Sequence, residues 1–126
     1  MLTVATGKDV GLLVLRLGVG MLMLFPHGYS KVVNFTIKMN QFPDPLGIGS
    51  TLSLTGAVFS EVVCSILIML GIKTRIFATM PLFTMIVAAF IVHANDPWMQ
   101  KEKAVLFGLM YLVIIFTGGG KYSVRD

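Results

Sequence analysis

Two ionisable residues, Arg16 and Glu61, lie inside long apolar stretches of the sequence. A charged side chain at the centre of a bilayer costs from about 3 to more than about 10 kcal/mol, so each needs a partner or a water-filled cavity. The two charges are opposite, and a planar guanidinium can hold a carboxylate through two hydrogen bonds. We therefore predict that Arg16 and Glu61 pair near mid-depth on neighbouring antiparallel helices. Such a pair would either fix the register of the helices or contact a ligand, and the sequence leaves both roles open.

Further polar residues recur near these two charges along predicted helix faces. His27 lies on the same helical stripe as Arg16, about three turns away, and Lys31 stands one turn beyond it. His93 ends a later apolar stretch, and Tyr111 lies on a small-residue stripe of the last one. The histidines would either line a pocket mouth or cap helices at the membrane surface. The candidate buried network or ligand site consists of Arg16, His27, Lys31, Glu61, His93 and Tyr111.

The composition is typical of a protein surrounded by lipid. Hydrophobic residues make up 56% of the 126 residues, and charged residues make up 13%, about half the usual share. The net charge of +4 comes from basic residues scattered one or two per loop, so we expect the lipid bilayer as a partner and no nucleic acid. The single cysteine, Cys64, excludes an internal disulfide, and we expect no metal site.

The hydropathy pattern predicts an all-α membrane protein, a bundle of four transmembrane helices in a single domain over 1–126. A spanning helix needs about 20 apolar residues, and four stretches approach that length. The segment from Asn34 to Thr51 is apolar in part and rich in proline towards its middle. We predict that it lies in the headgroup layer between the first two helices, with an ordinary surface loop as the alternative. The predicted spans cover approximately residues 10–31, 52–72, 76–93 and 97–117.

Basic residues in the short loops predict the orientation. With four spans, both termini and the loop carrying Lys73 and Arg75 share one side of the membrane, which then holds five basic residues against four on the other. We therefore expect the N- and C-termini in the cytoplasm. His27 and His93 then both lie near the outer surface.

The order and spacing of several motifs together resemble the DoxX family, over nearly the whole chain. In chain order these features are Arg16 in the first span, His27-Gly28-x-x-Lys31, Phe42-Pro43-Asp44-Pro45-Leu46-Gly47, Glu61 in the second span, Gly71-x-x-Thr74-Arg75, His93, and a glycine-rich close with Tyr122-Ser123. The resemblance implies a multi-pass protein of the bacterial cytoplasmic (inner) membrane with a link to oxidoreductase systems. Some relatives are associated with quinol oxidation and others with thiol or oxidative stress.

These observations lead to three functional hypotheses. The first is an accessory subunit of a membrane redox system, without catalytic residues of its own, that holds a quinone or another lipophilic ligand. Its partner would be a membrane-protein complex or further copies of the chain. The second is a small proton-coupled transporter that uses Glu61, although an arginine beside this glutamate would keep it ionised. The third is a purely structural subunit of a larger membrane complex.

Overall fold

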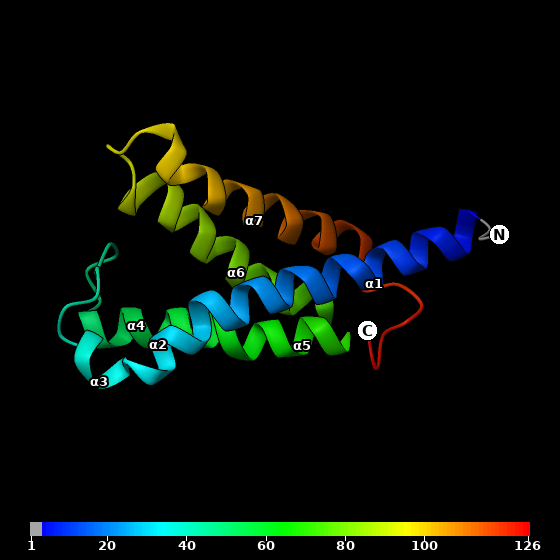
Figure 1. The fold of residues 1–126 in the computed structure, drawn as a ribbon, viewed down its shortest axis with the longest axis horizontal. Coiled ribbons are helices and arrows are strands. Elements are labelled where there is room, and N and C mark those ends of the chain that lie inside the picture. Colours follow the sequence, from blue (N-terminus) through cyan, green and yellow to red (C-terminus); the bar gives the residue numbers. More distant parts are fainter. Residues whose placement is uncertain (1–3) are drawn as a thin grey trace.

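The computed structural model describes residues 4–126, and over this range the chain forms four long helical segments (Figure 1). Three of them contain a π-helical turn, written η. The elements are α1 (Val4–Met23), η1 (Leu24–Tyr29), α2 (Ser30–Val33), α3 (Phe35–Lys38), α4 (Ser50–Val58), η2 (Phe59–Val63), α5 (Cys64–Leu70), α6 (Thr74–Val87), η3 (Ala88–Val92) and α7 (Trp98–Thr117). Within this range the chain forms no β-strand, and its one β-bridge joins Ile72 to Arg125. The all-α prediction is therefore confirmed.

Three segments of the described chain are long and apolar enough to cross a membrane: Thr6–Val33, Ser50–Leu70 and Thr74–Val92. The helix α7 occupies the range expected for a fourth span, but its first two turns carry Lys101, Glu102 and Lys103. Its uninterrupted apolar part begins only at Ala104, and 14 residues reach about 21 Å, less than the roughly 30 Å of a hydrocarbon core. The fourth crossing therefore stays a prediction.

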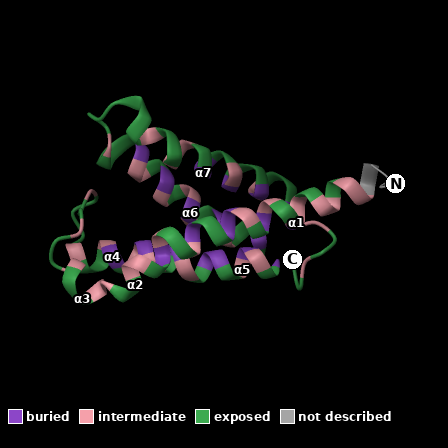
Figure 2. Ribbon diagram, viewed as in Figure 1, coloured by how far each residue is buried: buried purple, intermediate pink, exposed green. Residues whose placement is uncertain are grey.

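Large apolar side chains cover the outside of the molecule. Val14, Phe25, Ile76 and Phe116 are each more than 60% exposed. Figure 2 shows the buried residues gathered where α1, α5 and α6 meet, with exposed residues on the outward faces. A water-soluble protein rarely presents so much contiguous apolar surface, whereas lipid solvates it without cost.

Glycine sets how closely the first two long segments approach. A Cβ added at Gly28 would lie 2.7 Å from a methyl of Val62 and 3.1 Å from the carbonyl oxygen of Glu61. One added at Gly20 would lie 2.2 Å from the Met69 side chain. These contacts fix an antiparallel register in which Gly28 faces Glu61, and small residues allow such close packing in lipid.

The four segments form a wedge. In Figure 1 the hairpin of α6 and α7 diverges from α1 and α4 towards the end that carries α3 and the following loop. At the other end the chain closes on itself. There Lys121 N donates to Asp9 Oδ1 at 3.2 Å, and Val124 N and Arg125 N donate to the Leu70 and Gly71 carbonyls. We call the end with α3 and the following loop the open end. We call the other end the closed end; it consists of Arg16, the Gly71–Lys73 turn and the Gly118–Asp126 tail.

Candidate functional site

The predicted pair of Arg16 and Glu61 is wrong. Arg16 is fully buried, and its guanidinium donates to three backbone carbonyls: Ile68 at 3.2 Å, Met69 at 3.0 Å and Tyr122 at 2.5 Å. The first two carbonyls belong to the last turn of α5, where the helix dipole favours a cation. The Ile68 carbonyl also accepts from Gly71 N at 3.1 Å. Arg16 therefore caps α5 and ties the C-terminal tail to it.

Glu61 instead forms an ion pair with Lys31, whose Nζ lies 2.9 Å from Glu61 Oε1. The carboxylate is only 5% exposed and the lysine 18%. The second oxygen, Oε2, has no hydrogen-bond partner among the described residues. Glu61 therefore lies at the level of Lys31, near the open end.

The wrong pairing has a simple geometric cause. On the first segment, Gly28 is the residue that faces Glu61. Arg16 lies twelve residues before Gly28, which places it about 18 Å further towards the closed end. Apolar composition places two residues in a membrane but does not give the relative sliding of their helices. The close contact at Gly28 decides that sliding, and it brings Lys31 within reach.

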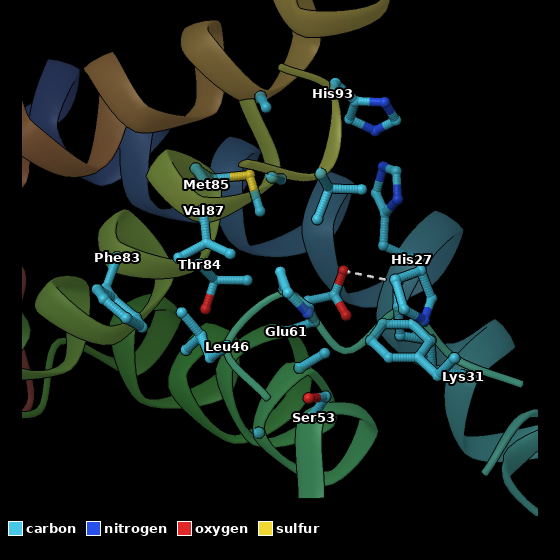
Figure 3. Close-up of a pocket in the computed structure, with 18 of the residues that line it drawn as sticks. His27, Lys31, Leu46, Ser53, Glu61, Phe83, Thr84, Met85, Val87 and His93 are labelled. Atoms are coloured by element: carbon cyan, nitrogen blue, oxygen red, sulfur yellow. Dashed lines mark hydrogen bonds and ion pairs between the residues drawn. The ribbon is translucent and has the colours of Figure 1, made fainter. Parts of the chain in front are cut away.

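A pocket of about 500 Å³ occupies the open end (Figure 3). It lies between α4 and the diverging α6 and α7, and Met23, His27 and Lys31 of the first segment complete its wall. Most lining groups are apolar, including Met85, Val87 and Phe107. The polar or ionisable ones are His27, Lys31, Ser53, Glu61, Thr84, His93, Gln100 and Lys103. This combination of an apolar interior with a few polar groups is typical of a small-molecule site.

The structure brings four of the six predicted site residues together at this pocket: His27, Lys31, Glu61 and His93. In Figure 3 the imidazole rings of His27 and His93 point towards one another. The His27 ring packs edge-on against Phe107, with centroids 6.0 Å apart. His93 Nδ1 lies 2.7 Å from Asp96 Oδ2, so its ring is held by its own loop.

The other two predicted residues do not line the pocket. Arg16 lies at the closed end, as described above. Tyr111 is fully buried behind the pocket wall, where it stacks on Phe107 with centroids 6.4 Å apart. Its hydroxyl has no hydrogen-bond partner among the described residues.

π-helical turns accompany the pocket in each of the three apolar segments. The first, η1, contains His27; the second, η2, contains Glu61; and the third, η3, ends directly before His93. Such wide turns are rare and often occur at functional sites, because they shift side chains relative to a regular helix. A sequence signal exists only for η1, because Pro26 lacks the backbone N–H that a regular α-helix needs at this position.

The loop after α3 forms part of the pocket rim. Phe42, Pro43, Pro45, Leu46 and Ile48 all line the pocket, which explains why this connection is partly apolar. Its location in the headgroup layer stays a prediction.

Asp44 holds the loop to the start of α4. Its carboxylate accepts hydrogen bonds from Gly49 N at 2.8 Å, Ile48 N at 2.9 Å and Ser53 Oγ at 2.9 Å. These bonds, chiefly that from Gly49, lower the pKa of Asp44.

Sequence reasoning missed the four residues on the α7 side of the pocket: Gln100, Lys103, Ala104 and Phe107. The spacing of four between Lys103 and Phe107 could have indicated a shared helix face. Nothing in the sequence indicated that this face lines the pocket.

The arrangement suits binding of a lipophilic molecule with a polar head. Of the described residues, no group of three or more histidine, cysteine or acidic side chains could hold a metal ion. The apolar interior would take a hydrocarbon or ring system, and the imidazoles and lysines would contact the head group.

The apolar helical segments and the pocket define the class: a multi-pass helical membrane protein with a polar-edged cavity at one end. The family model DoxX matches residues 11–94, about two thirds of the chain. The chain therefore belongs to the DoxX family, and the resemblance seen in the sequence is confirmed. Comparison with curated proteins gave no significant match, and comparison with solved structures gave none either.

Proposed function

We propose that this DoxX-family protein binds a lipophilic ligand in the pocket at its open end, as an accessory subunit of a membrane redox system. The observation that carries the proposal is the pocket itself, with about 500 Å³ of largely apolar space edged by His27, Lys31, Glu61 and Lys103. A quinone is the ligand class that we favour. Its ring and tail suit the apolar walls, and its carbonyl oxygens accept hydrogen bonds from imidazole and ammonium groups.

Purification in mild detergent followed by lipid extraction and mass spectrometry tests this proposal. A Gly56→Leu variant should block the site, because Gly56 lines the pocket and a Cβ added there meets only Met80 Cε, at 3.9 Å. Gly18→Leu is the matched control, since nothing lies within 4 Å of a Cβ at Gly18. We expect a co-purifying lipophile in the wild type and the control and its loss from Gly56→Leu. No enriched lipophile in the wild type would contradict the proposal.

We also propose that α7 is a fourth crossing, which puts both termini in the cytoplasm of a bacterium with the protein in its inner membrane. The hydrogen bond from Lys121 N to Asp9 Oδ1 supports termini on one side. The test places single cysteines at position 121 and at position 95, in a Cys64→Ser background, and exposes each variant to a membrane-impermeant thiol reagent. Labelling of position 95 alone in intact spheroplasts is expected, and labelling of position 121 alone would reverse the orientation.

A proton-coupled transporter is the second candidate, and one observation favours it. Glu61 pairs with the titratable Lys31 and not with an arginine, so the argument that Arg16 keeps this carboxylate ionised no longer applies. Proton-driven flux in proteoliposomes that Glu61→Gln abolishes would support transport.

A further inference from the structure

The charges that line the pocket do not balance. Lys31 and Lys103 are cationic, and Glu61 is the one carboxylate among the lining residues of the described chain. Because Lys31 Nζ already pairs with Glu61, the unbalanced charge falls on Lys103. Glu102, next to it, is exposed and does not line the pocket.

Two lysines in the first turns of α7 differ in their contacts. Lys101 Nζ donates to the Ala94 carbonyl at 3.0 Å and does not line the pocket. Lys103 lines the pocket, is exposed at its edge, and forms no hydrogen bond or ion pair with any described residue. Lys101 therefore holds the loop before α7 in place, whereas the Lys103 ammonium is available to bind a ligand.

Two other residues that line the pocket, His27 and Gln100, offer further unused donors. His27 lies close enough for the charges of Lys103 and Lys31 to act on its ring, and its ring nitrogens have no hydrogen-bond partner among residues 4–126. The side-chain amide of Gln100, less than one turn before Lys103, is likewise without a partner in that range. A cation beside neutral N–H donors, at the edge of an apolar cavity, is an arrangement that receives an anion.

We propose that the ligand of this pocket carries a single negative charge on its head group, which Lys103 binds with help from His27, while its apolar tail fills the cavity. This inference rests on the proposed lipophile site and replaces the neutral quinone with an acidic lipophile as its preferred ligand. One negative charge balances the one unpaired cation, and a charge-assisted hydrogen bond is about twice as strong as a neutral one. A free lipophilic acid and an anionic phospholipid both supply such a head.

Paired ligands test the inference. In purified wild-type protein in neutral detergent, binding of a long-chain carboxylate is compared with binding of its methyl ester and of a neutral alkyl quinone. We expect the carboxylate to bind about tenfold more tightly than the ester, and this preference to fall to less than about threefold in Lys103→Gln. Lys101→Gln is the matched control and should keep the full preference.

The outcomes separate this inference from the proposed function. Equal binding of carboxylate and ester, or a preference that Lys103→Gln leaves unchanged, would overturn the anionic head and leave the lipophile site standing. Failure of all three ligands to bind would overturn the proposed function itself. Competition in nanodiscs then identifies the source of the ligand. Displacement of the bound carboxylate by phosphatidylglycerol assigns the site to a bilayer lipid, whereas a carboxylate that stays bound assigns it to a free acid. Either result supports a negatively charged head group.

Discussion

The two ends of the bundle use cations of the same helical segment in different ways. At the closed end all the bonds of Arg16 go to backbone carbonyls, and the tail packs over it. At the open end Lys31 holds a carboxylate beside a cavity, and neighbouring donors stay unused. A basic residue in a membrane helix is therefore not by itself evidence of a ligand site. What distinguishes the two ends is the surroundings of the cation: backbone carbonyls enclose Arg16, whereas Lys31 and its carboxylate line a cavity.

The largest expected effect comes from removing the cation at the closed end. Arg16→Met would remove the side-chain donor from the Met69 and Tyr122 carbonyls, and one of the two donors of the Ile68 carbonyl; a buried unsatisfied polar group costs about 1–3 kcal/mol. We expect the free energy of unfolding in detergent to fall by roughly 3 kcal/mol or more. Lys8→Met, at an exposed position of the same helix, is the control. A loss below about 0.5 kcal/mol would mean that Arg16 does not hold the closed end together.

The ion pair at the open end should show coupling. Lys31→Met or Glu61→Met alone strands a largely buried charge, and we expect each to lower the free energy of unfolding by about 1–3 kcal/mol. The double variant should lose less than the sum, with a coupling energy of about 0.5–3 kcal/mol. Additive losses in thermal unfolding would show that the pair is not a unit.

Helix register depends on Gly28, the residue of the first segment that packs against Val62 and the Glu61 backbone. Gly28→Ala introduces a Cβ 2.7 Å from Val62 and 3.1 Å from the Glu61 carbonyl oxygen, and we expect a loss of about 1–3 kcal/mol in stability. Gly18→Ala, with open space around its Cβ, should be neutral or slightly stabilising. The account of the register fails if both alanine variants unfold alike.

The smallest effect concerns acid sensitivity at the closed end. Burial raises the pKa of Asp126, but hydrogen bonds from the Thr74 hydroxyl and from the backbone N–H groups of Gly119 and Thr74 outweigh it, so the net pKa lies below its usual value. A lowered carboxyl pKa stabilises the fold above the unfolded value of about 4, and this contribution is lost as the pH falls through the folded value.

The measurement is the unfolding midpoint as a function of pH. Asp126→Asn should reduce its fall below about pH 4, whereas Glu102→Gln should leave the fall as it is. An unchanged acid slope in Asp126→Asn would exclude this carboxylate as the acid-sensitive group.

The sequence was sufficient for the parts of the fold that hydropathy controls. Apolar stretches gave the helical segments, and Gly118 to Gly120 gave the end of α7, where Gly118 has a φ of 72°. His27, Lys31, Glu61 and His93 were singled out because polar groups in apolar segments need a reason. These four meet at one pocket.

What the sequence could not supply was the relative placement of the helices. The partner of Glu61 depends on the contact at Gly28, and the roles of Lys101 and Lys103 depend on the direction in which α7 diverges. Tyr111 lies on a predicted small-residue stripe of α7, yet it stacks on Phe107 and does not line the pocket. Such outcomes are set by packing in three dimensions and not by residue type and spacing.

An experimental structure of the wild-type protein in lipid nanodiscs, purified without lipid exchange, tests the central claim most directly. We predict continuous elongated density between α4 and the hairpin of α6 and α7, with its polar end beside His27 and Lys103. A hairpin packed closely against α4, with side chains filling the cavity, would contradict the account.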